Sequence, residues 1–208
     1  MAGEQGEANA WYAMSRIFLK PEFSRRNLAE ARRYLEKAAE GGHVNAQVEL
    51  GLLAWRNRRI DTRSDIKAVY WLLKAEGQGN VEAKNILSKI IPPFRKAEWA
   101  HLARATFTRE TVNQYPFLAA RVELGFWFGL TRAEALLIDV HEADHGHCLE
   151  IDIRHEHPRS RRRLVLIQTG EQRQALDRAA RVFDTVDGSP MGAPCNYRRR
   201  LYRFRSLM

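Results

Sequence analysis

An internal repeat of 37 residues in the first half of the chain constrains the fold most strongly. The segment 29–46 returns as 66–83 with the same residue types at the same offset. Small alanines at fixed positions let neighbouring helices pack closely, and a glycine after the first helix of each copy permits a sharp turn into the second. The pairs at this offset are Ala31 and Ala68, Leu35 and Leu72, Lys37 and Lys74, Gly42 and Gly79, and Ala46 and Ala83.

The repeat predicts stacked helical hairpins. We expect helices over 7–19, 28–40, 44–56, 65–76 and 81–90. The run 37–51 is similar to the recurring sequence of the Sel-like repeats, relatives of the tetratricopeptide helix pairs. That resemblance implies a concave face that holds a peptide or a partner protein. The partner-binding candidates are Trp11, Tyr12, Trp55, Tyr70 and Trp71, and the alternative is that these aromatic side chains form the core between the repeats.

Two consecutive prolines, Pro92 and Pro93, end the repeat array, because proline cannot continue a helix. We therefore divide the chain into a repeat domain over 1–93 and a second domain over 94–208. The segment from 94 to about 109 lacks glycine and serine, so we expect a connecting helix there rather than a loose linker.

The second domain is organised around an apolar run over 117–128, which predicts a buried helix. Gly129 ends this helix. Thr131 and Glu134 then form a capping box, in which a hydroxyl and a carboxylate satisfy backbone N–H groups at the start of a short helix.

A β-hairpin is expected after the short helix. Apolar and polar residues alternate over 148–154, and a short apolar run covers 164–167, so both segments predict strands. A very basic connection over 155–163 joins them, and Thr169 with Gln172 caps a third helix over 171 to about 183. The predicted fold class is mainly α, with an N-terminal α/α repeat and a C-terminal α+β domain that contains one β-hairpin.

This order of elements resembles the catalytic core of the tyrosine recombinases, the phage-type integrases, over roughly 114–204. Four short motifs carry the resemblance, and they follow one another as in an integrase family of bacterial mobile elements. The matching residues are Phe128, Gly129, Leu130, Glu134, Ala135 and Leu136; Ala143, Asp144 and Gly146; Arg161, Arg163, Val165 and Ile167; and Glu171, Gln172, Arg173, Leu176 and Asp177. The resemblance implies a fold whose hairpin touches DNA beside the cleavage site.

The catalytic residues that the resemblance requires are missing. Such an enzyme uses two arginines, a hairpin lysine, a His-x-x-Arg motif and a tyrosine nucleophile. Here Thr131 replaces the first arginine and Pro158 the lysine, and the other motifs would lie beyond Met208. Because charge neutralisation supplies most phosphoryl-transfer catalysis, we expect a truncated integrase-like fold that is not an enzyme. A coincidental α+β domain and an active strand-exchange enzyme are the alternatives.

Positive charge is concentrated in the last quarter of the chain. The whole chain carries +9, and the segment 154–208 holds 13 arginines, no lysine and five acidic residues, a formal charge of +8. Arginine favours bidentate phosphate contacts, and a localised basic field is typical of nucleic-acid binding. The alternatives are a solvated face and a face that pairs with an acidic protein. The DNA-binding candidates are Arg132, Arg159, Arg161, Arg162, Arg163, Arg198, Arg199, Arg200, Arg203 and Arg205.

We expect no metal or cofactor. The segment 141–148 is rich in histidine and acidic residues, but it lacks the paired spacings of zinc sites. Asp144 with Gly146 is instead typical of the turn before a strand. There is also no phosphate-binding loop and no glycine-rich dinucleotide fingerprint.

Two cysteines, Cys148 and Cys195, give no disulfide framework, which favours a reducing compartment. The N-terminal segment has no signal pattern, and no apolar run reaches transmembrane length, so we expect a cytoplasmic protein without a membrane partner. The function predicted is a non-catalytic, DNA-associated accessory or regulatory protein of a mobile element, which holds a protein partner through its repeats. The alternative is a protein-interaction scaffold with no nucleic-acid role.

Overall fold

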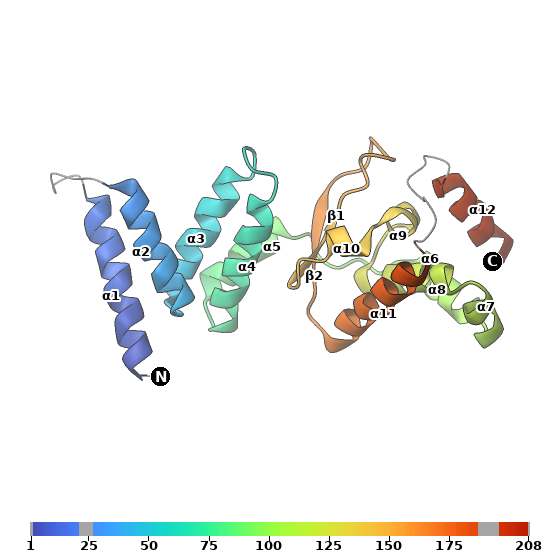
Figure 1. Ribbon diagram of the computed structural model, residues 1–208, viewed down its shortest axis with the longest axis horizontal. Helices are drawn as coiled ribbons and strands as arrows, with labels where there is room; N and C mark the ends of the chain where they lie inside the picture. Colours follow the sequence, from blue (N-terminus) through green and yellow to red (C-terminus); the bar gives the residue numbers. More distant parts are fainter. Residues whose placement is uncertain (1, 21–26, 187–195, 208) are drawn as a thin grey trace. The chain divides into compact units, whose positions relative to one another are not determined.

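The computed structural model describes residues 2–20, 27–186 and 196–207, and its described part is mainly helical (Figure 1). The chain forms two compact units, Met1–Ile90 and Ile91–Met208. A mainly α chain with one two-stranded antiparallel hairpin is therefore confirmed. Within the described ranges, no helix combines the length and the apolar character that crossing a membrane requires.

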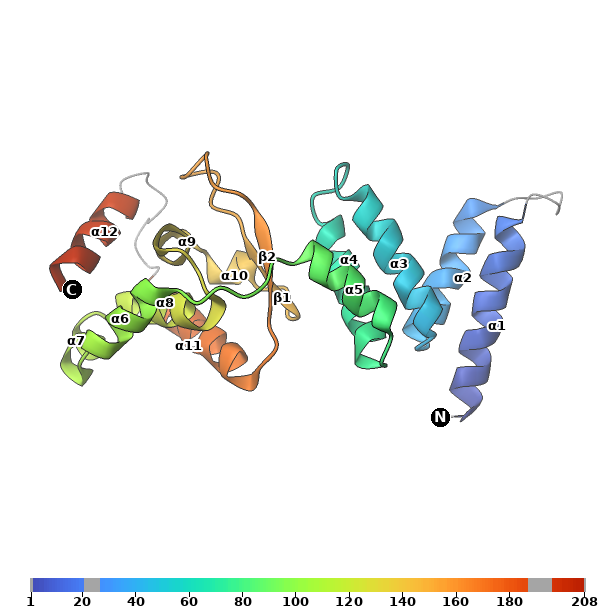
Figure 2. The same cartoon turned by 180° about the vertical axis from the view of Figure 1, so that it is seen from behind.

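The first unit is an array of helices in which each packs against the next. The helices are α1 (Ala2–Leu19), α2 (Leu28–Glu40), α3 (Val44–Asn57), α4 (Ser64–Gly77) and α5 (Val81–Ile90). Successive helices lie side by side in both ribbon views (Figures 1 and 2). The predicted bounds of α2 to α5 agree to within one residue, whereas α1 begins at Ala2 and not at Glu7.

The two copies of the 37-residue repeat form helical hairpins with the same turn geometry. Gly42 and Gly79 have positive φ angles of 91° and 85°. The residue after each glycine donates its backbone N–H to the carbonyl five residues earlier, which closes both helix ends in the same way. The side chain of that residue, His43 or Asn80, then caps the next helix. The buried pairs at the same offset are Ala31 and Ala68, Leu35 and Leu72, Ala38 and Ala75, Ala46 and Ala83, and Leu50 and Leu87.

The second unit contains the remaining helices and the hairpin. Its elements are α6 (Glu98–Thr106), α7 (Arg109–Gln114), α8 (Pro116–Phe128), α9 (Arg132–Leu137), α10 (Val140–Ala143), β1 (Cys148–Ile151), β2 (Arg163–Leu166), α11 (Gly170–Val186) and α12 (Asn196–Leu207). The strands pair antiparallel, with Cys148 opposite Leu166 and Ile151 opposite Arg163. The predicted hairpin is confirmed, although β1 ends three residues before the alternating pattern does and β2 lies one residue earlier than predicted.

Two features of the second unit differ from the expected order. The expected connecting helix forms over α6 only, and the side chain of Thr108 then accepts the N–H of Thr111 and begins the separate helix α7. The short helix α10 was not predicted, and Asp139 caps it by accepting the N–H of His141. In both places a side chain that caps the following helix divides the chain.

The core of the second unit lies between α8, the hairpin and α11. Leu124 and Phe128 of α8 are at most 1% exposed, and they belong to one cluster with Leu149, Ile151 and Leu176. Partly buried aromatic side chains of α6 and α8 pack against this core. The hairpin is therefore fixed to the helical core along its strands, while the connection between the strands extends away from it (Figures 1 and 2).

A buried arginine joins α8 to α9. Arg121 is 3% exposed, and its guanidinium lies 4.4 Å and 4.7 Å from the ring centres of Phe117 and Phe183. It donates hydrogen bonds to the carbonyl oxygens of Ala135 and Ile138, at 2.8 Å and 3.2 Å. Hydrogen bonds and aromatic faces offset the desolvation of this charge, so Arg121 serves the fold.

Gly129 ends α8 in the left-handed conformation, with φ 59° and ψ 38°. A Cβ atom at this position would lie 2.1 Å from the carbonyl oxygen of Arg95. The helix end predicted at Gly129 is confirmed, and both the backbone conformation and the neighbouring carbonyl require glycine there.

We expect Gly129→Ala to destabilise the second unit by more than the ~1–2 kcal/mol that a left-handed alanine costs, because the Arg95 carbonyl must also move. Gly146→Ala is the matched control, since Gly146 has φ 83° but nothing lies within 4 Å of its added Cβ. Hydrogen-exchange mass spectrometry in urea reads the second unit separately from the repeats. Equal losses in the two variants would show that the Arg95 contact contributes nothing.

Candidate nucleic-acid interface

Arg154 of the hairpin pairs with Asp152, and the four hairpin arginines predicted to bind DNA divide into two pairs. Arg159 and Arg161 lie in the connection between β1 and β2, and both are exposed. Neither forms an ion pair with an acidic side chain in the described part of the chain. Arg162 and Arg163 instead bind carboxylates at the base of the hairpin. Only the first pair is therefore open to an anion from outside.

Arg163 forms a bidentate ion pair with Glu134 at the start of α9. The Nε–Oε1 and Nη2–Oε2 distances are both 2.9 Å, and Nη2 also lies 3.3 Å from the carbonyl oxygen of Gly129. The Oε2 atom of Glu134 accepts the backbone N–H of Thr131 at 2.7 Å, so the predicted capping box is confirmed. The same carboxylate thus caps a helix and holds a strand.

Two carboxyls that bind arginines, the buried Glu134 and the half-buried Asp144, have lowered pKa values. Burial opposes ionisation of Glu134, but hydrogen bonds from Arg163 and from the backbone outweigh it and lower the pKa of Glu134. The pKa of Asp144 is also lowered, because hydrogen bonds from Arg173 and the Gly146 N–H overcome its burial. Both groups are ionised at neutral pH, and each neutralises its arginine.

Arg162 belongs to a partly buried cluster on β1. Its Nε donates to Oε1 of Glu150, while Nε2 of His145 lies 3.0 Å from Oε2 of the same carboxylate. The side chains of Arg162, Glu150 and His145 are 15%, 20% and 22% exposed. This arginine therefore supports the hairpin from within and does not project toward a ligand.

The helix α12 packs onto the second unit through one apolar face. Phe204 is 1% exposed and meets the ring of Trp99 edge-on, with ring centres 5.5 Å apart. Tyr197, Leu201 and Leu207 pack against the same cluster. Their spacing of three or four residues places them on one side of the helix.

The arginines of α12 have different surroundings. Arg200 donates to the carbonyl oxygen of Leu136 at 2.6 Å, near the end of α9. Arg132, at the start of α9, is exposed, and its guanidinium lies 5.2 Å from the ring centre of Phe204. Three described arginines of α12 are exposed and form no ion pair with an acidic side chain among the described residues of the chain. They are Arg198, Arg203 and Arg205. The side chain of Arg199 lies outside the described residues.

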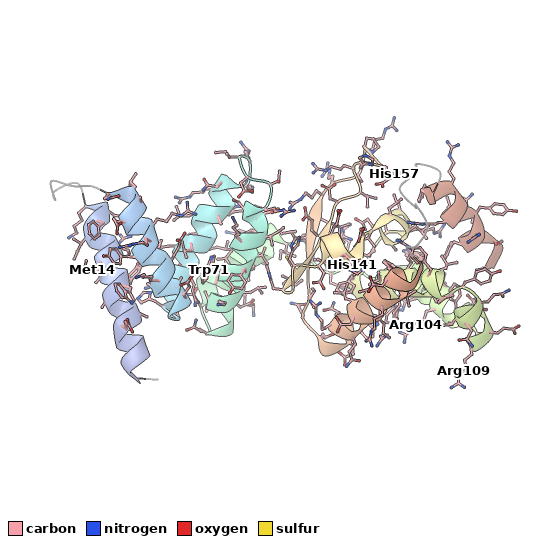
Figure 3. The ribbon with its side chains drawn as sticks, in the orientation of Figure 1. Met14, Trp71, Arg104, Arg109, His141 and His157 are labelled. Carbon is pink, nitrogen blue, oxygen red and sulfur yellow. The ribbon has the colours of Figure 1, made fainter. Side chains whose placement is uncertain are left out.

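The hairpin connection and α12 meet through an aromatic contact. The rings of His157 and Tyr197 lie 5.2 Å apart at an interplanar angle of 85°. Figure 3 shows His157 in the connection, beside the start of α12. This contact brings together two groups of arginines that are far apart in the sequence. We call the exposed set the arginine surface, and it consists of Arg159, Arg161, Arg198, Arg203 and Arg205.

The N-terminal partner-binding candidates contact side chains of their own unit. Trp11 stacks on Tyr34, with ring centres 5.5 Å apart. Tyr12 stacks on His43 at 4.0 Å and donates its hydroxyl hydrogen to Glu49 at 2.6 Å. Both rings also pack against the buried cluster between α2 and α3, so they contribute to the core of the repeats.

The remaining candidates of the repeats lie beside cationic side chains. The guanidinium of Arg58 lies 4.0 Å from the ring centre of Trp55. Tyr70 and Trp71 meet edge-on at 5.0 Å, and Nζ of Lys74 lies within 5.3 Å of both ring centres. Trp71 packs against the repeat core, whereas Tyr70 is 38% exposed, which leaves it the more accessible of the two.

The histidine-rich turn before β1 is stabilised by a hydrogen bond from its own backbone. Among the residues that the structure describes, no three His, Cys, Asp or Glu side chains are grouped to hold a metal ion. Asp144 accepts the N–H of Gly146 at 2.8 Å and forms the turn predicted there. Cys148 is buried, and Cys195 lies outside the described residues.

One exposed aromatic residue of α12 was missed from the sequence. Tyr202 is 75% exposed and lies between Arg198 and Arg205 in the helix. A signal was available, because the helical spacing of Tyr197, Leu201 and Phe204 assigns the inward face and leaves Tyr202 outside it. The contact of His157 with Tyr197 could not be predicted in this way, because it depends on where the hairpin lies in the folded unit.

We expect Glu134→Gln to lower the unfolding free energy of the second unit by about 2 kcal/mol at neutral pH, because glutamine can still cap α9 but leaves Arg163 without its anion. A lowered folded pKa means that Glu134 stabilises the fold above its unfolded pKa of about 4.3, and that this stability is lost as the pH falls through the folded pKa. The variant should therefore lose less stability than the wild type on acidification.

Urea unfolding at a series of pH values, read by hydrogen exchange, measures this difference. Glu142→Gln is the matched control, because Glu142 is exposed and forms no ion pair within the described residues. It should leave both the stability and its pH dependence unchanged. A wild-type pH profile in Glu134→Gln would contradict the assigned role of this carboxylate.

The chain was compared with protein-family models, with curated proteins and with solved structures, and none of the three comparisons gave a match. The resemblances to Sel-like repeats and to tyrosine recombinases therefore rest on the sequence motifs alone.

Proposed function

We propose that this chain is a non-catalytic, DNA-associated accessory or regulatory protein that binds DNA through its arginine surface and a protein partner through its helical repeats. One observation carries the proposal. Exposed arginines of the hairpin and of α12, without acidic partners in the described part of the chain, are joined by the contact of His157 with Tyr197. The resemblance to integrases suggests a mobile genetic element as the setting.

The chemistry of these side chains favours phosphate as the ligand. A guanidinium group is always charged and offers paired donors that match a phosphate bidentately. Several such groups on one surface bind the phosphate backbone with little dependence on base sequence, and they release counterions when they do so. The surface is therefore suited to sequence-tolerant binding that weakens as the salt concentration rises.

The non-catalytic part of the proposal rests on two residues. Thr131 occupies the position where the resemblance requires an arginine, and its hydroxyl oxygen accepts the N–H of Glu134 at 3.3 Å in the cap of α9. Pro158 occupies the position of the hairpin lysine and has no proton to donate. Neither residue can neutralise or protonate a scissile phosphate. Covalent protein–DNA adducts on a nicked substrate would overturn this part.

A second candidate function is a protein-interaction scaffold without a nucleic-acid role. Apolar side chains exposed on the repeat unit favour it, and they include Leu53, Ile60, Tyr70 and Val81, at 42%, 90%, 38% and 68% exposure. Exposed apolar groups of this kind suit a protein partner. Under this function the arginine surface pairs with acidic protein, and captured partners survive nuclease treatment.

We expect the double variant Arg159→Ser/Arg161→Ser to bind duplex DNA more weakly than the wild type and with a smaller salt dependence. Each arginine that contacts a phosphate contributes about 1 to the slope of log affinity against log salt, so the slope should fall by roughly 2. Fluorescence anisotropy at several salt concentrations measures both quantities. Arg162 and Arg163 are left intact because their carboxylate pairs hold the hairpin.

The matched control removes the same charge from the repeat unit. Arg56→Ser/Arg59→Ser changes two exposed arginines that have no ion pair in the described residues. It should leave the affinity and the slope unchanged. Equal weakening in both double variants would assign the binding to net charge alone, and no binding by the wild type at low salt would retire the DNA proposal.

A further inference from the structure

The outward face of α12 carries an aromatic ring between two arginines. Successive residues of an α-helix are turned by about 100°, so Arg198, Tyr202 and Arg205 fall within about 60° of one another around the helix. With a rise of 1.5 Å per residue, the two arginines are separated by about 10 Å along the helix axis. All three side chains are exposed, and Tyr202 lies between the two cations.

The ring of Tyr202 has no role in holding α12 in place. The packing of this helix comes from Tyr197, Leu201, Phe204 and Leu207 on the opposite side. Within the described residues, Tyr202 makes no hydrogen bond and no ring or cation contact. A single exposed apolar side chain is ordinary. Here, however, the ring of Tyr202 lies between two guanidinium groups without acidic partners among the described residues, so one face of α12 offers both an apolar contact and a charged contact.

That combination matches an unpaired nucleotide. Each nucleotide offers a flat base and a charged phosphate, and a tyrosine ring stacks on any base because every base has a π-face. In a duplex the base faces are covered by their neighbours, and only the base edges and phosphates are accessible. A protruding ring on a helix therefore gains from a single strand a contact that a duplex cannot supply.

We propose that Tyr202 is a stacking site for an unpaired base, and that the arginine surface binds single-stranded nucleic acid in preference to duplex. Arg198 and Arg205 contact the phosphates on either side of the stacked nucleotide. The contact of His157 with Tyr197 holds the hairpin connection, which carries Arg159 and Arg161, at the first turn of α12, which also carries Arg198. This inference rests on the proposed function and specifies the ligand of the same surface.

The test compares a fluorescent oligothymidine with the same strand in a duplex. A length of about 20 nucleotides is sufficient, because one domain that binds single strands through aromatic and basic side chains covers about 4–16 nucleotides. Anisotropy titrations at low salt should show tighter binding of the single strand. Tyr202→Ser should weaken single-strand binding by about 5- to 100-fold and leave duplex binding unchanged, since stacking is available only to the unpaired base. Tyr202→Phe keeps the ring and should bind as the wild type does.

Two controls separate the possible failures. Leu102→Ser removes another exposed apolar side chain of the second unit, 63% exposed, and should leave both affinities unchanged. Circular dichroism of Tyr202→Ser should match the wild type, because the residue lies outside the packed face. Single-strand affinity that is unaltered in Tyr202→Ser, or that falls equally with duplex affinity, overturns the stacking site while DNA binding stands. Absence of binding to either nucleic acid overturns the proposed function itself.

Discussion

The arrangement of the second unit depends on one buried carboxylate. Glu134 closes the start of α9, pairs with Arg163 at the start of β2, and through that arginine reaches the carbonyl of Gly129 at the end of α8. Three elements that are separate in the sequence are therefore fixed at one point. A buried charge is tolerated only when it is paired and hydrogen-bonded, and here the same groups that satisfy the charge also set the position of the hairpin.

The fold itself decides which arginines remain available. Arg121 and Arg200 bind carbonyl groups at the end of α9, and Arg162 and Arg163 bind carboxylates at the base of the hairpin. The formal charge of the last quarter therefore overstates the positive charge that faces solvent. The acidic partners lie near the core, so the arginines that remain open are those farthest from it along the hairpin and on the outer side of α12.

The features predictable from the sequence were those with a local signal. The offset of 37 residues located the repeat helices, and the capping pairs at Thr131 and Thr169 are both confirmed. The caps at Thr108 and Asp139 are of the same chemical kind but were not predicted. The division of the arginines had no local signal, because Glu134 is 29 residues from Arg163 and their pairing exists only in the folded unit. The two family resemblances stay predictions.

The composition of the arginine surface has a consequence for control. A guanidinium group does not lose its proton within the range in which proteins are folded, and this surface contains neither lysine nor a carboxylate of its own. Its field is thus the same in acidic and in alkaline surroundings. Neither acidification nor lysine acetylation can neutralise such a surface, whereas competing polyanions, dissolved salt or a covering partner can block it.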